Sequence, residues 1–467
     1  MRALLAAVPL LAVVASILAG RTSRTAALIG CGAVLTVAAI AFPVTAETAL
    51  QAGRDWAPVV LEVVLVIGGG ILFAETGRAT GSQATLAAWL TRSLGTGIAP
   101  VLAIVHGFTP LTESVTGYGI GAALAVPLLL GLGLPGKRAA IVGLLGLCAV
   151  PWGSMGPGTL IAAQLTGVDF DALGVSTAIF NGTVFLAVGI AAALLVSPPG
   201  RRLTNCLAAV ASGLVLWGGV LGTNLLIGTA PAGALGGLLV LACHLAFRVL
   251  SGHPVRVSRA VLRAARPYGV VLGGVLVATL TFAALGLADS LAADIGGSPA
   301  LWLFAAVIPT LLLRREIRGP ALRSAARTWV RVAPAIVLFI GLGAAMGVSG
   351  MSEELAAQLA KLGASYRFLL PLFAALIGFI TGSNSGANAL AAGAQGDVAR
   401  VLGADVPLAI GAHNAAGAAA MMASPARVEL ATRLALVPGE ARSVQRTLLL
   451  VLAIAVAAMG LVSLILL

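Results

Sequence analysis

Apolar runs of 15 to 25 residues recur along the chain and are separated by short polar or basic segments. Because a membrane-crossing helix needs about 20 mostly apolar residues, this pattern predicts an all-α polytopic membrane protein. The alternation of polar and apolar residues that is typical of a transmembrane β-barrel is absent from the sequence. Clear spans are predicted near residues 4–20, 26–42, 59–76, 173–196, 204–228, 232–249, 267–287, 300–313 and 332–350.

Two polar interruptions lie beside arms that are short for a full span. The first joins residues 98–112 to residues 118–134, and we call residues 112–119 the first tip. The second interruption, residues 381–388, follows the apolar run 369–380, and we call it the second tip. Such interruptions are typical of re-entrant hairpins and broken helices, whose freed backbone N–H groups can hold a solute. Close helix packing through Gly, Ser and Ala is the alternative for the second tip.

Further breaks and the basic residues define the expected organisation. Broken helices are predicted at residues 151–158 and 413–425. Ten arginines lie in the segments 256–266 and 314–331, whereas the loop between them carries acids, including Asp289. Arginine-rich loops stay in the cytoplasm, so the spans that follow residues 58 and 331 are expected to run in opposite directions.

These two oppositely directed spans open similar stretches of sequence. Residues 67–77 match residues 340–350 at an offset of 273, and Glu113–Gly119 matches Gly382–Asn388 at an offset of 269. The matches occur in the same order, so the sequence predicts an inverted repeat, in which substrate and coupling ion bind between paired discontinuous helices. The expected parts are N-terminal scaffold spans (1–58), a first repeat (59–165), linking scaffold spans (166–331), a second repeat (332–432) and a C-terminal span (433–467).

Composition narrows the function. Apolar residues make up 59% of the 467 residues and charged residues 9%, so the lipid bilayer is the expected environment. The net charge of +12 comes from arginines at the ends of apolar runs, which topology explains, and no nucleic-acid partner is expected. The sequence has no phosphate-binding loop, metal-ligand cluster or nucleophile elbow. We therefore expect no enzyme activity, catalytic residue, metal site or cofactor.

Glu113 in the first tip is the one acid between Glu75 and Asp169. A carboxylate at membrane depth is costly and usually functional, so Glu113 is a candidate proton carrier or ion ligand. A tip carboxylate that merely reaches water is the alternative. Neighbouring residues are expected to contact the solute, with ordinary packing as the alternative for the tyrosine; they are Ser114, Thr116, Gly117, Tyr118 and Gly119.

The second tip has no acid of its own. Its oxygens and amides are predicted to bind a carboxylate or a cation; they belong to Thr381, Ser383, Asn384, Ser385 and Asn388. Asn414 is a further candidate ligand, and the adjacent His413 is a candidate for proton coupling because imidazole changes charge near neutral pH. A hydrogen-bonded structural histidine is the alternative. Gln395 is expected to be solvated at the far end of the hairpin arm.

Taken together, these motifs resemble the lactate permease family of bacterial secondary transporters. The resemblance covers residues 59–165 and 332–432 and rests on Glu113 with Gly117-Tyr-Gly119, Phe379–Leu390 with Gln395, and Asn414–Gly417 with Ser424-Pro425. More distantly, the tips at 114–116 and 383–385 are similar to the ion transporter superfamily. In that group, two re-entrant hairpins bind a carboxylate substrate and move as an elevator against a scaffold.

The resemblance implies an elevator-type transporter that imports lactate or glycolate with a proton across the bacterial cytoplasmic (inner) membrane. Half-helix N-termini in the tips would bind the carboxylate. Elevator-type relatives are commonly dimers, so a homodimer is an expectation. The family commonly has an acid where this chain has Asn384, and typical members are longer. Two alternatives stay open: a sodium-coupled (Na+) transporter of another organic anion, and a passive channel or non-transporting membrane scaffold.

Overall fold

The computed structural model describes residues 1–288 and 290–467, and Asp289, one of the acids considered above, lies outside the described residues. All regular elements in these residues are helical. Eleven helical segments among them are long and apolar enough to cross a membrane, or up to twelve if the bent pair α14 (Leu291–Gly297) and α15 (Pro299–Leu313) is one span. The protein is therefore an all-α polytopic membrane protein.

The other helices have the following bounds. The first part of the chain forms α1 (Arg2–Leu18), α2 (Ser23–Ala41), α3 (Ala46–Thr80), α4 (Ser82–Leu94), α5 (Ile98–Leu102), α6 (Thr109–Thr116), α7 (Ile120–Gly131), α8 (Gly136–Leu145) and α9 (Pro157–Thr166). The middle forms α10 (Phe170–Val196), α11 (Arg202–Leu226), α12 (Ala232–Leu250) and α13 (Arg259–Ala284). The last part forms α16 (Arg315–Val348), α17 (Met351–Leu359), α18 (Ser365–Thr381), α19 (Asn384–Val401), α20 (Val406–Ala420), α21 (Pro425–Leu434) and α22 (Ala441–Leu466).

Two helices are longer than their predicted spans because polar sequence continues them. α3 starts at Ala46, before the predicted span 59–76, and Thr45 caps it by accepting a hydrogen bond from the backbone N–H of Thr48. α16 starts at Arg315 and carries the arginine-rich segment into the predicted span 332–350. Alanine, leucine and arginine are strong helix formers, so these polar extensions stay helical.

The same order of helices occurs twice along the chain. A long helix (α3 or α16) leads to a short one (α4 or α17) and then to a hairpin, made by α5, α6 and α7 or by α18 and α19. The helix that follows, α8 or α20, runs into a 3-10 segment. A short helix, α9 or α21, then begins with proline, which is favoured in the first turn because its missing N–H costs no hydrogen bond there.

The short helix of each set packs against the hairpin of the other set. α9 lies against α19, and α21 lies against α7 and α8. The glycine Gly158 makes the first contact close, because a Cβ there would lie 2.7 Å from Asn384 Nδ2. This exchange of short helices brings the two hairpins together in the middle of the molecule.

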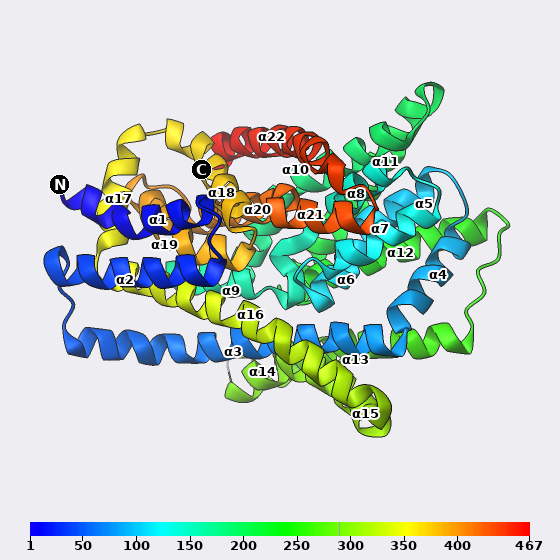
Figure 1. The fold of residues 1–467 in the computed structure, drawn as a ribbon, viewed down its shortest axis with the longest axis horizontal. Helices are drawn as coiled ribbons and strands as arrows, with labels where there is room; N and C mark the ends of the chain where they lie inside the picture. The colour runs from blue at the N-terminus through cyan, green and yellow to red at the C-terminus, as the bar shows by residue number, and fades with distance from the viewer. Residues whose placement is uncertain (289) are drawn as a thin grey trace.

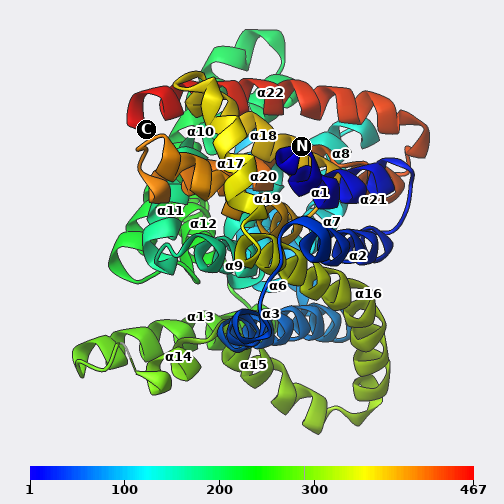
Figure 2. The same cartoon turned by 90° about the vertical axis from the view of Figure 1, so that its left-hand side faces the viewer.

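The buried apolar side chains form two main hydrophobic clusters. One cluster joins the hairpin arms to α8, α10, α12, α20 and α22. The other joins α1, α2, α3, α13, α15 and α16, and it also includes Val115, Ile161, Ala389 and Leu390 from α6, α9 and α19. Figures 1 and 2 show α3, α13, α14 and α15 along one side of the molecule and α22 along the opposite side. The first cluster includes α10 and α12 from the middle of the chain, so it is not continuous in sequence.

The breaks are shorter than the predicted polar segments. At the first tip, residues 112–116 are helical and the chain turns only at Gly117–Gly119. At the second tip, the turn is Gly382–Ser383, and residues 384–388 belong to α19. The break predicted at 413–425 starts only after Ala420, because the run Ala412–Ala420 continues α20 through its good helix formers.

Candidate functional site

A cavity of about 460 Å³ lies between the two tips and α16. Residues 328–339 of α16 form one wall, and the two tips, with residues 150–158 and 421–427, form the others. The predicted site residues that line the cavity are Glu113, Gly117, Tyr118, Thr381, Ser383, Asn384 and Ser385. The cavity thus lies where α16, from the second hydrophobic cluster, faces the hairpins.

The turn of the first tip is held by the carboxylate of Glu113. Gly117, Tyr118 and Gly119 have φ values of 68°, 58° and 79°, a left-handed run that costs little at the glycines but strains the tyrosine. The Glu113 oxygens accept hydrogen bonds from the backbone N–H groups of Gly119 (2.8 Å) and Gly121 (2.9 Å). The carboxylate therefore occupies the N-terminus of α7, where the helix dipole stabilises negative charge.

The second tip is held by neutral groups. Gly382 has φ 60°, and Ser383 caps α19 by accepting a hydrogen bond from the backbone N–H of Gly386 at 3.1 Å. Thr381 Oγ1 donates to the carbonyl of Ile377 at 2.8 Å. No acidic side chain lines the cavity on this side, so the N-terminus of α19 carries no carboxylate of the protein within the described chain.

A buried amide network lies behind the second tip. Asn414 Oδ1 accepts hydrogen bonds from Asn384 Nδ2 (3.0 Å) and Asn388 Nδ2 (2.9 Å). Asn414 Nδ2 donates to the hydroxyls of Thr159 (2.9 Å) and Thr177 (3.1 Å). Asn384 alone of these residues reaches the cavity, so the network connects the cavity to α9, α10 and α20. Asn388 and Asn414 therefore do not line the cavity; they form hydrogen bonds that hold Asn384, the candidate ligand, in position.

Several other predicted site residues also lie away from the cavity. Ser114 is fully buried against α12, because a Cβ on Gly233 would lie 2.5 Å from its Oγ. The Thr116 hydroxyl donates to the Thr112 carbonyl at 2.6 Å, a bond within its own helix. Gly119 packs under the side chain of Arg427. In this conformation the polar side chains that the first tip turns to the cavity are those of Glu113 and Tyr118.

His413 is fully buried in α20, behind the second tip. Neither of its ring nitrogens makes a hydrogen bond of normal geometry in the part of the chain that the structure describes, although the backbone carbonyl of Ala387 lies near the ring. Unpaired polar groups in the interior are costly. His413 therefore remains a candidate for proton coupling, that is, for a group whose hydrogen-bond partner or protonation state changes during the transport cycle.

The structure corrects the expectation for Gln395. Its side chain is only 3% exposed, and its Oε1 has no hydrogen-bond partner among the described residues. The residue sits on the inner face of α19, beside Gly396, where a Cβ would lie 2.8 Å from Thr166 Cγ2. The polarity of Gln395 suggested a solvated arm end, but α19 packs closely against α9 at this level.

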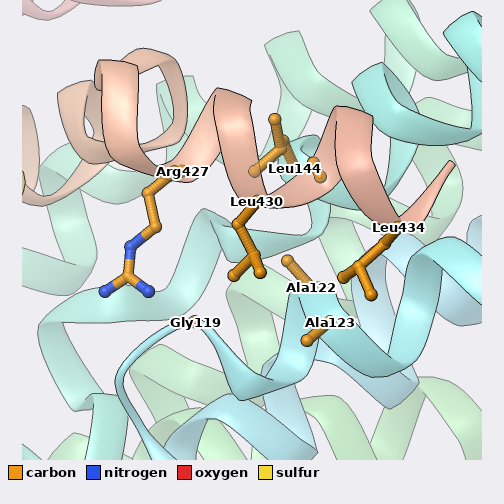
Figure 3. Close-up of a pocket in the computed structure, with 8 residues that line it drawn as sticks. Gly119, Ala122, Ala123, Leu144, Arg427, Leu430 and Leu434 are labelled. Atoms are coloured by element: carbon orange, nitrogen blue, oxygen red, sulfur yellow. The ribbon is translucent and has the colours of Figure 1, made fainter. Parts of the chain in front are cut away.

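Arg427 was not singled out by the sequence, yet it lines the cavity. It lies in the first turn of α21, and Figure 3 shows its side chain reaching from this helix toward Gly119. The Nη1 atom donates a hydrogen bond to the carbonyl of Tyr118. The sequence signal that could have identified Arg427 is its position two residues after Pro425. Proline often begins a helix, and the first turn of such a helix lies next to the preceding break.

Ser154 is a second residue of the site that the sequence did not predict, although it lies within the predicted break 151–158. It has φ 45° and ψ 49°, a left-handed conformation that is rare for serine, and Met155 follows with φ 62°. Ser154 lines the cavity, but its Oγ is buried against Gly70 of α3 and has no partner within the described residues. Strained backbone of this kind persists only where the surrounding structure enforces it, and it concentrates at functional sites.

The charges around the cavity favour an anion. One acid, Glu113, and two arginines, Arg331 and Arg427, belong to its lining. Arg331 is exposed, whereas Arg427 is partly covered by α7 and the first tip. Because the cations exceed the acid by one, a small monoanion would balance the fixed charges. Among the described residues, no cluster of three His, Cys, Asp or Glu side chains is placed to hold a metal ion.

Comparison with known proteins agrees with this picture. The family model described as L-lactate permease matches residues 2–260 and 292–467, which is nearly the whole chain. No individual curated protein matches the chain.

Proposed function

This chain belongs to the L-lactate permease family, and we propose that it imports a small monocarboxylate such as lactate or glycolate together with a proton. Membership makes it a membrane transporter of lactate-like substrates rather than an enzyme. The proposal adds the direction of transport, the coupling ion and a location in the bacterial cytoplasmic membrane.

The observation that carries the proposal is the cavity shared by the two tips. It is large enough for a small organic ligand, and it combines hydroxyl, amide and guanidinium donors with one carboxylate. The substrate would hydrogen-bond to the second tip through Ser383, Asn384 and Ser385, and to Tyr118 of the first tip. Half-helix N-termini that meet in a cavity are a recurrent way for transporters to hold carboxylates.

The position of Glu113 supports proton coupling. Its carboxylate lines the cavity at membrane depth, where an ionisable side chain is costly and usually functional. Glu113 is our first candidate for the proton carrier. Its protonation would also weaken the hydrogen bonds from Gly119 and Gly121, and so loosen the first tip. His413, buried without hydrogen-bond partners in the described chain, is the second candidate.

We further propose that the two similar sets of helices are an inverted repeat and that the protein works as an elevator. The reciprocal packing of α9 on α19 and of α21 on α7 supports a two-fold relation between the sets. The second hydrophobic cluster supports a scaffold around α3, α13, α15 and α16, and the hairpins, which contribute Val115, Ala389 and Leu390 to this cluster, would move against it. A homodimer through this scaffold is part of the same proposal.

Uptake of labelled L-lactate into proteoliposomes tests the proposed function. With an inward proton gradient and no sodium, we expect L-lactate or glycolate to accumulate above its external concentration, and a protonophore to abolish the accumulation. Equilibration without accumulation would indicate a passive channel. Absence of uptake of any short hydroxy acid, with or without sodium, would contradict the transport proposal.

A sodium-coupled transporter of another organic anion is the second candidate. It is favoured by Asn388, whose Oδ1 is buried and has no partner among the described residues, while its Nδ2 donates to the oxygens of Asn384 and Asn414. Neutral oxygens of this kind suit a hard cation. Sodium dependence of uptake at a fixed, equal pH on both sides separates this candidate from proton symport.

A further inference from the structure

Arg427 reaches the cavity from the helix set that does not contain the first tip. It is the third residue of α21, and a Cβ on Gly119 would lie 2.0 Å from its Nη1 and 2.7 Å from its Cζ. The guanidinium therefore lies directly on the first tip, with Leu430 next to Arg427 and Leu434 farther along the same helix (Figure 3). Only a glycine at position 119 leaves room for this contact.

The bonding capacity of this guanidinium is mostly unused. Arginine has five N–H donors, and the one hydrogen bond that the described residues form with the Arg427 side chain goes to the Tyr118 carbonyl. None of the ion pairs formed within residues 1–288 and 290–467 includes Arg427. Glu113 lines the same cavity, but both of its oxygens accept hydrogen bonds from the first tip.

The surroundings fit a carboxylate ligand. A guanidinium offers two parallel N–H donors that match the two oxygens of a carboxylate. The cavity beside it is also lined by the neutral second tip. The other arginine of the lining, Arg331, is exposed on α16 and suits attraction of an anion better than its final binding.

We propose that Arg427 is the charge partner of the substrate: its guanidinium binds the carboxylate of the transported monoanion. The assignment deepens the proposed function and rests on it. Because the same guanidinium also holds the Tyr118 carbonyl, binding of the anion is linked to the position of the first tip. The second tip then supplies neutral donors to the rest of the substrate.

Binding of L-lactate and of lactamide to the purified full-length protein in lipid nanodiscs tests the assignment, with isothermal titration calorimetry as the readout. Lactamide has nearly the same shape but no charge. For Arg427→Gln, we expect the dissociation constant of L-lactate to rise about 30-fold or more, as when one partner of a desolvated charge pair is removed. The dissociation constant of lactamide should stay the same. Arg433→Gln is the matched control, because Arg433 lies on the same helix, exposed and paired with Glu429 at 2.5 Å.

The outcomes separate the alternatives. Equal losses for lactate and lactamide in Arg427→Gln would show that Arg427 only clamps the first tip, and would overturn the assignment. If this variant does not fold, Arg427→Lys is the deciding variant. Lysine keeps a positive charge and an N–H donor but lacks the two parallel donors of a guanidinium, so the dissociation constant of L-lactate should rise about tenfold while that of lactamide stays unchanged. Wild-type protein that transports L-lactate but binds it no better than lactamide would also overturn the assignment. If wild-type protein neither binds nor transports any short hydroxy acid, the proposed function itself fails.

Discussion

A carboxylate and a guanidinium hold the turn of the first tip, whereas amides and hydroxyls hold the turn of the second. Glu113 bonds to the N–H groups of Gly119 and Gly121, and Arg427 bonds to the carbonyl of Tyr118. At the second tip, Ser383 supplies the cap and Asn414 bonds to Asn384 from behind. Two hairpins at corresponding places in the two sets of helices thus line one cavity and differ in chemistry.

The difference can be followed to single positions. α9 and α21 both begin with proline, and their third residues are Thr159 and Arg427. Thr159 accepts a hydrogen bond from Asn414 under the second tip, while Arg427 reaches the first tip. The charged groups therefore lie at the first tip and the neutral donors at the second. In the repeat that we propose, the two half-sites are therefore unequal and would orient a substrate with one charged end.

Removing the carboxylate should have the largest effect, because it leaves two N–H groups of the first tip without an acceptor. Each such group costs about 1–3 kcal/mol. We expect Glu113→Ala to lower L-lactate uptake into proteoliposomes about 30-fold or more. Size-exclusion chromatography and thermal unfolding in the same detergent separate loss of the tip from loss of the whole fold.

Glu113→Gln sharpens the same test, because it keeps the shape and one acceptor but cannot gain or lose a proton. Exchange of labelled for unlabelled lactate should persist in this variant, while accumulation driven by a pH gradient should disappear. Wild-type accumulation in Glu113→Gln would remove Glu113 from proton coupling and leave it only the role of a cap. His413 would then be the group to test.

Disrupting the neutral tip should have the next largest effect. Asn414→Ala removes a side chain that accepts from two asparagines and donates to two threonines. Since each net hydrogen bond contributes about 0.5–1.5 kcal/mol, we expect lower thermal stability and about tenfold weaker lactate uptake. Asn205→Ala is the control, because Asn205 makes a single side-chain bond, to Ser197, on another part of the molecule. Equal effects of the two variants would contradict a special role for the network.

A further variant, Gly158→Ala, tests the fit of α9 against the second tip. A Cβ at Gly158 would lie 2.7 Å from Asn384 Nδ2 and 3.1 Å from the backbone nitrogen of Ser385. Overpacking costs about 1–3 kcal/mol, so Gly158→Ala should weaken lactate uptake about fivefold or more. Gly341→Ala in α16 is the matched control, since a Cβ there meets no atom within 4 Å. A wild-type KM for lactate in Gly158→Ala would show that the second tip tolerates displacement.

The sequence predicted the membrane class of the fold, because runs of apolar residues long enough to span a bilayer leave few alternatives. It also placed both tips, since glycines between polar residues interrupt apolar arms. It could not predict which side chains face the cavity: residues 112–116 are helical, so Glu113 and Ser114 point to different sides. Arg427 was missed because its partner, the Tyr118 carbonyl, is a backbone atom 309 residues earlier in the chain.

The smallest expected effects come from two serines, one in each tip. Ser385 lines the cavity, and Ser385→Ala should weaken lactate binding about two- to tenfold, the range for one hydrogen bond. Ser114 is fully buried against α12, and its hydroxyl has no partner among the described residues, so Ser114→Ala should leave the KM for lactate unchanged. The two variants are equal in size and chemistry, so they compare the tips directly by initial-rate uptake. A larger loss in Ser114→Ala than in Ser385→Ala would mean that the first tip turns its hydroxyl toward the substrate during transport. The neutral donors of the substrate site would then be shared by both tips.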